Sequence, residues 1–347
     1  MGVMSRLALV SLAISSLFLV QRQTLQPSPL LQAMNQVSEN RLRANLSFLS
    51  SDALEGRGTP SRGLDVAAEF IASRFREAGL TPIGDNGYFQ TGEVSVRGQS
   101  EKGHAYNVVG MLKGVDPKLN DTYILVTAHY DHLGMRTQGE GDLIYNGAND
   151  DGSGTVGVIE LSQAMSKLKP KRSIIFMTYF GEERGGLGSR WYANHPLVPI
   201  AKTIANINLE QIGRTDDSEG KRVDELSMTG YDYSNLGEMM NSVSKEVGIK
   251  ITKHPVNSDA FFFRSDNATL AGYGVPAHTV CTAFVYPDYH ALSDTWDKVD
   301  YANEARILRG LLAALNSIAS SDVEPKWNAD NPKAARYYEA WKKTHGG

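Results

Sequence analysis

The chain has 347 residues, of which 41% are hydrophobic, and it carries a formal net charge of -4 at pH 7. This length and apolar content are enough for the core of one large α/β domain, and no shift in composition marks a second domain. Because the charge balance is acidic and no basic run occurs, the composition argues against nucleic acid as a partner.

The first 25 residues are predicted to form a signal peptide or an N-terminal anchor. A single basic residue, Arg6, precedes an apolar run from Leu7 to Val20. The run is short for a membrane span but suits the core of a signal peptide. No clear cleavage pattern follows Val20, so an uncleaved membrane anchor is the alternative, and a buried first helix is the least favoured reading. We therefore expect an exported protein, periplasmic or secreted, or one held at the membrane by this segment.

Helix-like and strand-like segments alternate along the rest of the chain. Apolar residues at helical spacing predict helices over residues 41–49, 66–78, 152–167, 189–194, 235–247 and 303–320. Apolar and β-branched runs predict strands over residues 106–112, 123–126, 173–180, 203–209 and 278–285. This alternation predicts a single-domain, three-layer α/β/α fold with a mostly parallel central sheet. We expect a catalytic domain over residues 38–322 and a C-terminal tail over 323–347.

An acidic pair, Glu182 and Glu183, follows the apolar run Ile174 to Phe180. At the end of a strand, adjacent side chains point to opposite sides. One carboxylate can therefore bind a metal while its neighbour transfers protons.

Further metal-binding side chains occur in similar positions. His129 and Asp131 close the run from Tyr123 to Ala128, Glu210 ends the run from Ile204 to Leu209, and Asp150 and His290 lie in loops. Functional residues gather at the carboxyl ends of strands in open α/β sheets. Imidazoles and carboxylates are ligands that zinc takes, and five of them suffice for two zinc ions if one carboxylate bridges.

Taken singly, each of these residues has a commoner explanation, such as a structural histidine or a solvated carboxylate. The metal site is favoured because all five ligands occur in one order, each in its own local context. Other residues keep the commoner explanation: His132 is expected in a pocket wall or at the surface, His254 and His278 in structural roles, and Cys281 as a core thiol. The trio Phe261 to Phe263 is expected either in a specificity pocket or in the core.

In combination, these motifs resemble the co-catalytic di-zinc aminopeptidase family, which includes bacterial leucyl aminopeptidases and glutamate carboxypeptidase-like zinc exopeptidases. The resemblance spans residues 54–300 and implies a zinc exopeptidase fold of the phosphorylase/hydrolase-like type. The matching segments are Leu54-Glu55-Gly56-Arg57, Asn107-Val108-Val109-Gly110, Thr127-Ala128-His129-Tyr130-Asp131, Asp150-Asp151-Gly152-Ser153-Gly154, Gly181-Glu182-Glu183, Arg264-Ser265-Asp266, Gly274-Val275-Pro276-Ala277, Tyr289-His290 with Asp294, and Asp297-Lys298-Val299-Asp300.

The resemblance implies a ligand set for two zinc ions. His129 and Glu210 would bind one ion, Glu183 and His290 the other, and Asp150 would bridge them. The peptide bond after Asp150 is expected to be cis. Glu210 stands where aspartate is commoner, which leaves the geometry at that ion less defined.

The resemblance also implies catalytic roles. Glu182 would act as general base, taking a proton from a metal-bridging water and passing it to the leaving amine. Asp131 would orient the ring of His129, and Tyr289 would add a hydrogen bond to the developing oxyanion. Arg264 would orient the substrate. Asn267 stands where the family often has histidine or tyrosine, a departure that bears on the polarity of the pocket.

The expected function is a zinc aminopeptidase acting on peptides. A glutaminyl cyclase-like acyltransferase with one zinc is an alternative, as is a carboxypeptidase of the same fold, and a non-catalytic binding module ranks last because no ligand is lost. The aminopeptidase is favoured because an acidic cluster attracts a free ammonium group. The preferred N-terminal residue and the oligomeric state are open at this stage.

Overall fold

The computed structural model describes residues 27–95 and 102–346. The predicted N-terminal segment, residues 1–25, lies outside the described residues. Within the described part of the chain, no helix combines the length and the apolar character that a membrane crossing requires.

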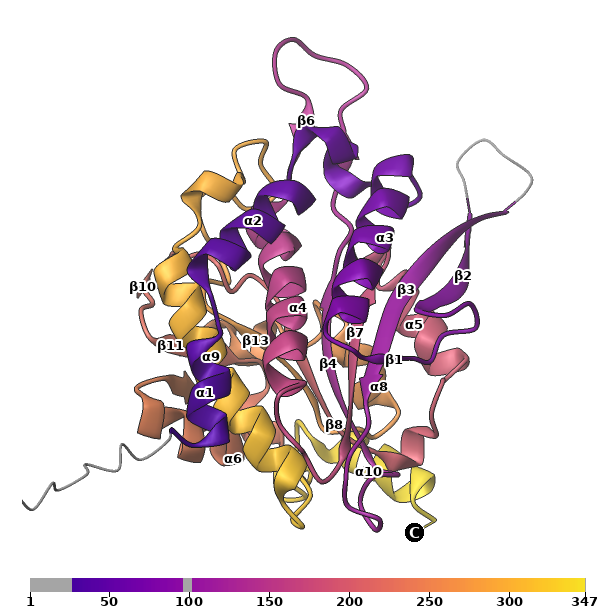
Figure 1. Ribbon diagram of the computed structural model, residues 1–347, viewed down its shortest axis with the longest axis vertical. Helices are drawn as coiled ribbons and strands as arrows, with labels where there is room; N and C mark the ends of the chain where they lie inside the picture. Colours follow the sequence, from indigo (N-terminus) through magenta and orange to yellow (C-terminus); the bar gives the residue numbers. More distant parts are fainter. Residues whose placement is uncertain (1–26, 96–101, 347) are drawn as a thin grey trace, which may run out of the picture.

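Among the described residues, nine strands form one central sheet, whose order is β1-β3-β7-β4-β8-β13-β11-β12, with β2 paired to β3 (Figure 1). Neighbours among β7, β4, β8 and β13 pair in parallel, whereas β3 is antiparallel to β7 and β11 is antiparallel to β13. The strands are β1 (Thr81–Pro82), β2 (Phe89–Ser95), β3 (Lys102–Leu112), β4 (Tyr123–His129), β7 (Ser173–Tyr179), β8 (Thr203–Leu209), β11 (Glu225–Met228), β12 (Lys250–Thr252) and β13 (Ala277–Cys281). Two short hairpins lie apart from this sheet: β5 (Gly134–Met135) with β6 (Ile144–Tyr145), and β9 (Asp216–Asp217) with β10 (Gly220–Lys221).

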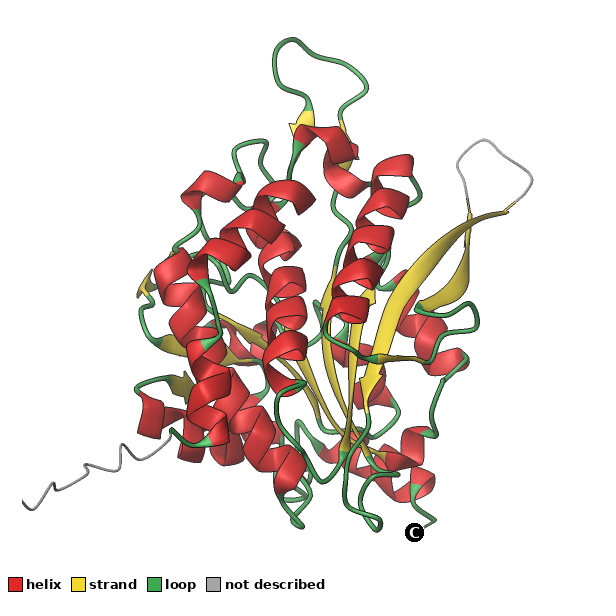
Figure 2. Ribbon diagram, viewed as in Figure 1, coloured by secondary structure: helices red, strands yellow, loops and turns green. Residues whose placement is uncertain are grey.

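Helices cover both faces of the sheet, as the red and yellow elements of Figure 2 show. One layer contains α1 (Pro29–Asn35), α2 (Glu39–Leu49), α3 (Arg62–Glu77), α4 (Gly154–Met165), α6 (Leu236–Ser244) and α9 (Tyr301–Ser320). The other layer contains α5 (Leu187–Asn194), α8 (Asn267–Gly272) and α10 (Ala335–Thr344), and the single-turn helix α7 (Asn257–Ala260) precedes α8. Every residue of β4, β7 and β8 is buried, as expected for parallel strands between two helical layers. The predicted three-layer α/β/α fold is confirmed.

The predicted elements are found with two informative shifts. The helix predicted from Gly152 begins at Gly154, because residues Ala148–Ser153 form an irregular turn before it. The strand predicted to reach Val285 ends at Cys281, just beyond the point where its neighbour β8 ends at Leu209. Side-chain pattern therefore located the elements, and pairing across the sheet set their ends.

Residues on both sides of the expected domain boundaries are packed into the two hydrophobic cores. Ala33 and Met34 of α1 belong to the core beneath α4 and α9. Trp327 and Tyr337, in the predicted tail, are buried in the core on the opposite face. The boundaries at 38 and 322 stay a prediction, but these flanking segments contribute to the packed structure.

Candidate metal centre

Three parallel strands bring predicted site residues to one edge of the sheet. His129 is the last residue of β4, Glu182 and Glu183 lie in the short turn after β7, and Glu210 directly follows β8. Since β4 lies between β7 and β8, the carboxyl ends of these strands are adjacent. The site is therefore built where an open α/β sheet presents functional side chains.

Asp150 comes from the turn between β6 and α4, which contains the expected cis peptide bond, Asp150-Asp151. The carboxylate of Asp294 accepts hydrogen bonds from the backbone N–H groups of Asn149, at 3.0 Å, and Asp150, at 3.1 Å. The hydroxyl of Tyr286 donates to the same carboxylate at 3.0 Å. Asp294 therefore fixes the backbone from which the Asp150 side chain projects.

The neighbouring carboxylate, Asp151, has a different task. It accepts hydrogen bonds from the backbone N–H groups of His129 (3.3 Å), Gly154 (3.0 Å) and Gln211 (3.0 Å). These donors belong to the end of β4, the start of α4 and the segment after β8. Asp151 thus joins three of the elements that carry the site, and this role was not assigned from the sequence.

The five predicted ligands meet around Asp150. One carboxylate oxygen of Asp150 lies 3.4 Å from Nε2 of His129, and the ligand atoms of His129, Asp150 and Glu210 lie within 4.8 Å of one another. The other oxygen lies 3.0 Å from Nε2 of His290, which is itself 3.3 Å from Oε1 of Glu183. We call His129, Asp150 and Glu210 the first ligand group, and Asp150, Glu183 and His290 the second. Asp150 belongs to both groups.

The donor atoms fit divalent metal ions. Nε2 of His129, Oε1 of Glu183 and Oε2 of Glu210 are buried, and none has a hydrogen-bond partner among the described residues. Buried polar atoms are normally paired, and imidazole nitrogens with carboxylate oxygens form the donor set that zinc takes. Burial raises the pKa of Glu210 to about 7, although the neighbouring His129 acts to lower it. A cation between these atoms would offset the cost of gathering such carboxylates.

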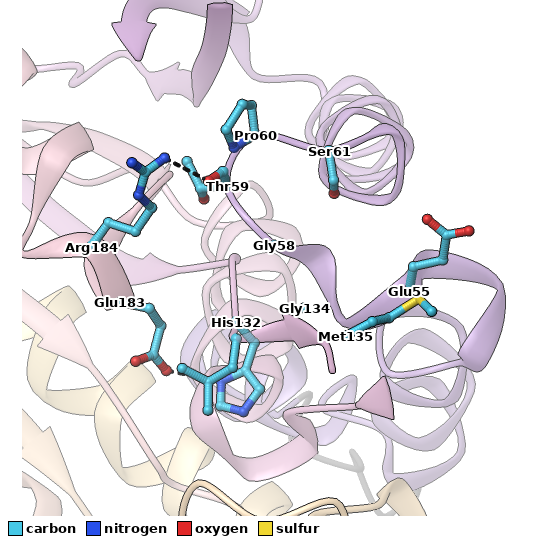
Figure 3. A pocket seen from close by; sticks show the side chains of 11 residues that line it. Glu55, Gly58, Thr59, Pro60, Ser61, His132, Gly134, Met135, Glu183 and Arg184 are labelled. Carbon is cyan, nitrogen blue, oxygen red and sulfur yellow. Dashed lines mark hydrogen bonds and ion pairs between the residues drawn. The ribbon is translucent and has the colours of Figure 1, made fainter. Parts of the chain in front are cut away.

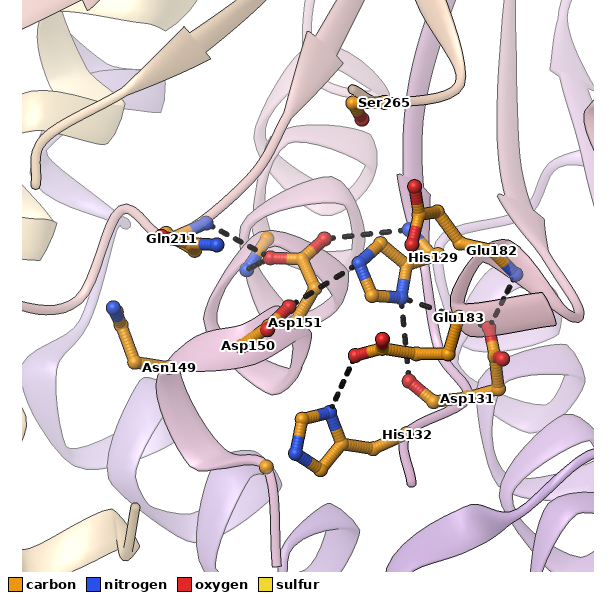
Figure 4. Close-up of polar contacts among 12 residues, drawn as sticks. His129, Asp131, His132, Asn149, Asp150, Asp151, Glu182, Glu183, Gln211 and Ser265 are labelled. Atoms are coloured by element: carbon orange, nitrogen blue, oxygen red, sulfur yellow. Dashed lines mark hydrogen bonds and ion pairs between the residues drawn. The ribbon is translucent and has the colours of Figure 1, made fainter. Parts of the chain in front are cut away.

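The Glu182 and Glu183 side chains point apart, as Figure 4 shows, with Glu183 directed toward His132 and Glu182 lying beside His129. The backbone N–H of Glu182 donates to Oδ1 of Asp131 at 3.0 Å. Burial, together with the carboxylates of Glu210, Asp266 and Glu183, raises the pKa of Glu182 well above its usual range. Glu182 is therefore a carboxylate with a strong affinity for protons.

Asp131 lies behind His129, on the side of the ring away from Asp150. Its Oδ1 is 3.6 Å from Nδ1 of His129, and its backbone carbonyl oxygen is nearer, at 3.2 Å. The hydroxyl of Thr59 donates to its Oδ2 at 3.2 Å. On this side of the ring, the Asp131 backbone carbonyl is therefore the hydrogen-bonding contact, and the carboxylate lies just beyond hydrogen-bond distance.

Tyr289 and Arg264 flank the two ligand groups. The Tyr289 ring stacks on His290, with 4.0 Å between centroids, and burial together with the carboxylates of Asp150 and Glu183 raises its pKa, so its hydroxyl stays a neutral donor. Arg264 is exposed, with its guanidinium 4.3 Å from the centre of the Phe261 ring. Arg264 and Phe261 line a small pocket beside Glu210. The three adjacent phenylalanines thus lie in different environments: Phe261 lines this pocket, Phe262 is in the core and Phe263 is exposed.

A second pocket, of about 360 Å³, opens beside the second ligand group (Figure 3). His132 and Glu183 form its inner end, and Thr59, Met135 and Arg184 line it further out. The guanidinium of Arg184 donates to the carbonyl oxygens of Thr59 (2.8 Å) and Ser95 (3.2 Å).

Sequence reasoning did not assign a role to Arg57, although its motif was singled out. Its side chain is 1% exposed, and the guanidinium donates to the carbonyl oxygens of Tyr130 (2.7 Å), Asn146 (2.8 Å) and Gly147 (2.9 Å). It therefore ties the segment after β4 to the turn that carries Asp150. A lone arginine beside a turn carries no local signal of burial, so only the motif match drew attention to it.

The residues with expected structural roles are accounted for. The ring of His278 contacts the carbonyl oxygen of Thr229 and the hydroxyl of Ser234, and His254 Nδ1 accepts from two backbone N–H groups. Asn267 is buried, and its amide donates to the carbonyl oxygen of Phe262 at 3.2 Å. Asn267 therefore holds α8 in place and does not line the pocket beside Glu210.

Fold and site together define an open α/β sheet that carries a candidate dinuclear metal centre at its carboxyl edge. Peptidase family M28 matches residues 107–315, and the chain belongs to this family. Among curated relatives, the chain is 32% identical over 231 residues to aminopeptidase YwaD of Bacillus subtilis, covering 63% of this chain and 46% of that protein. The chain spans about half the length of the curated relatives that it matches, or less.

Solved structures share the fold at low sequence identity. The aminopeptidase from Aneurinibacillus sp. strain AM-1 is similar with a TM-score of 0.63 and 17% identity, covering 82% of this chain and 95% of that one. The glutaminyl cyclase of Bacteroides thetaiotaomicron is similar with a TM-score of 0.62 and 15% identity, covering 81% and 98%. The architecture is thus common to proteins that are named for different activities.

Proposed function

We propose that this chain is an aminopeptidase that binds two zinc ions and hydrolyses the first peptide bond of peptides. The observation that carries the proposal is the sharing of Asp150 between two ligand groups. His129 and Glu210 would hold one ion with Asp150, and Glu183 and His290 would hold the other. A mononuclear site has no need of ligands on both sides of one carboxylate.

When bound, two zinc ions would activate a water molecule and polarise the scissile carbonyl group. Glu182 would accept the proton of that water and deliver it to the leaving nitrogen. Its position supports this assignment, because the Glu182 side chain is directed away from Glu183 and lies beside the ligand His129. The neutral hydroxyl of Tyr289 would donate a hydrogen bond to the oxygen of the carbonyl group.

An aminopeptidase is favoured over a carboxypeptidase by the charges around the site. The acidic residues attract the free ammonium group of a peptide. A carboxypeptidase needs a cationic group to bind the terminal carboxylate, and Arg184 is hydrogen-bonded to two backbone carbonyl groups. Arg264, which lies beside the pocket next to Glu210, would orient the substrate side chain there.

The proposal is tested with Glu182→Gln, which removes the base and keeps the size of the side chain. Loss of a general base typically slows turnover about 10²- to 10⁴-fold. We expect kcat for an aminoacyl arylamide to fall in this range, while metal content, measured by mass spectrometry, equals that of the wild type. Glu183→Gln is the matched control, because it should lose bound metal as well as activity.

Three results would contradict the proposal. Turnover of the metal-loaded Glu182→Gln variant at the wild-type rate would exclude the base assignment. One zinc per chain with cyclisation of an N-terminal glutamine would indicate the cyclase. Release of C-terminal residues from N-blocked peptides would indicate the carboxypeptidase.

We further propose that the protein is exported, on the basis of the apolar run from Leu7 to Val20. N-terminal sequencing of the protein recovered from expressing cells tests this assignment. A mature N-terminus beyond residue 20 in the exported fraction indicates a cleaved signal peptide. An intact N-terminus in the membrane fraction indicates an anchor, and an intact N-terminus in the cytosol contradicts export.

A further inference from the structure

His132 lies in the segment after β4, three residues beyond His129, and its side chain is fully buried. Its backbone N–H donates to the carbonyl oxygen of Arg57 at 3.2 Å. A Cβ atom at Gly147 would lie 2.4 Å from Cγ of the His132 ring, so this glycine leaves the space that the ring occupies. The edge of the ring also packs against His290, with 5.7 Å between centroids. The position of the imidazole is therefore fixed by its surroundings.

The imidazole faces the second ligand group. Nδ1 of His132 lies 2.9 Å from Oε1 of Glu183, the same oxygen that lies 3.3 Å from Nε2 of His290. The ligand atoms of His132, Asp150 and Glu183 lie within 4.8 Å of one another. Figure 4 shows the carboxylate of Glu183 directed at the His132 ring.

The contact between Nδ1 of His132 and Glu183 is at ion-pair distance but is not aligned as a hydrogen bond, and neither ring nitrogen has an aligned hydrogen-bond partner among the described residues. Nε2 of His129 is in the same situation beside Asp150. Buried imidazoles in structural roles are normally paired, as His278 is here with Ser234 and Thr229. Both ring nitrogens of His132 are thus free of aligned partners in the described part of the chain, and one of them lies within ligand distance of Asp150 and Glu183.

We propose that His132 is a direct ligand of the second metal ion through Nδ1, in addition to Asp150, Glu183 and His290. The inference rests on the proposed dinuclear site. It gives the second ion two imidazoles and two carboxylates, a donor number that zinc accepts. The two imidazoles differ in accessibility, because the His290 side chain is 35% exposed whereas that of His132 is buried. His132 is thus the interior ligand that keeps the second ion in place, and His290 closes the solvent side.

The test compares His132→Ala, His132→Asn and His290→Ala with the wild type in titrations with Zn²⁺ or Co²⁺ alone. Asparagine places an amide nitrogen near the position of Nδ1, so it preserves a hydrogen-bond donor but not the imidazole ligand. We expect both His132 variants to bind the first ion normally and the second ion at least about 100-fold more weakly, beyond the usual range for loss of a residue that only orients a ligand. His290→Ala should keep the second ion with reduced affinity, and the double variant should hold one ion.

Two spectroscopic measurements separate a ligand from a hydrogen-bond donor. X-ray absorption of the di-zinc wild type should count three imidazoles over two ions, and the visible spectrum of the Co²⁺ form should change in His132→Asn. Wild-type affinity for the second ion in His132→Ala, or an unchanged Co²⁺ spectrum in His132→Asn, would overturn the inference.

His278→Asn is the matched control, since it removes a buried imidazole away from the site and should lower stability without changing metal content. Circular dichroism checks that each variant is folded. If His132→Ala does not fold, the metal titration relies on His132→Asn. The outcomes for this inference and for the proposed function are distinct. A wild type that binds two ions and hydrolyses arylamides, with unaffected His132 variants, refutes only the ligand assignment. A wild type that binds fewer than two ions refutes both.

Discussion

Replacing Arg57 with methionine should destabilise the fold and weaken metal binding together. The guanidinium donates to four carbonyl oxygens, those of Leu49, Tyr130, Asn146 and Gly147. Methionine fills much of the same space but donates no hydrogen bond. Each buried carbonyl left without a donor costs about 1–3 kcal/mol, so the gross loss is about 4–12 kcal/mol.

Part of this loss is offset because the buried charge is itself costly. Burial lowers the pKa of Arg57 from 12.5 to about 10. A shift of roughly 2.5 units corresponds to about 3 kcal/mol against the charged form, which methionine relieves. From the middle of the gross range, we expect the free energy of unfolding to fall by about 3–6 kcal/mol.

Urea denaturation at pH 7, with and without Zn²⁺, measures this change. Arg43→Met is the control, because Arg43 is exposed and its guanidinium lies 4.2 Å from the centre of the Tyr301 ring. The control should lose about 1 kcal/mol or less. Because Arg57 holds the segments on either side of Asp150, its variant should also bind Zn²⁺ more weakly. The reasoning is refuted if the free energy of unfolding of Arg57→Met lies within about 1 kcal/mol of the wild-type value, or if its affinity for Zn²⁺ is unchanged. If the methionine variant does not fold, Arg57→Lys replaces it in the test. Lysine keeps one cationic donor group, so the loss in the free energy of unfolding should be smaller.

Two further predictions concern buried titratable groups away from the site. Glu304 in α9 is fully buried, neither of its carboxylate oxygens has a hydrogen-bond partner in the described residues, and burial raises its pKa well above 4.5. In the folded protein Glu304 keeps a proton that the unfolded chain releases above pH 4.5, so the folded state becomes less stable as pH rises. Glu304→Gln should therefore raise the free energy of unfolding by about 1–3 kcal/mol at pH 8, measured by urea denaturation. An equal increase at pH 4 would contradict this reasoning. Burial lowers the pKa of His278 from 6.5 to about 4. Between pH 6.5 and pH 4 the imidazole is protonated in the unfolded chain but stays neutral in the folded protein. The free energy of unfolding should therefore fall by about 3 kcal/mol as pH drops from 6.5 to 4, and His278→Asn should abolish that part of the pH dependence.

The sequence by itself determined the class of fold and the chemical types at the site. Continuous apolar runs such as Tyr123 to Ala128 are a local property, and they predict buried strands wherever the chain places them. Side chains that follow such runs, including His129 and Glu210, must then lie at one edge of a parallel sheet. This is why the candidate ligands could be recognised before any contact between them was known.

The tertiary structure alone decided how these side chains are held and which neighbours join them. Arg57 reaches Gly147 across 90 residues, and Asp294 reaches Asn149 across 145. His132, expected in a pocket wall or at the surface, lies in a pocket wall and also contacts Glu183. Such contacts depend on the path of distant loops over the sheet edge, and neither side-chain periodicity nor the spacing of residues within a motif encodes that path. The sequence therefore determined which residues can bind metal, whereas the packing of the loops decided their separations, their hydrogen bonds and the buried imidazole beside them.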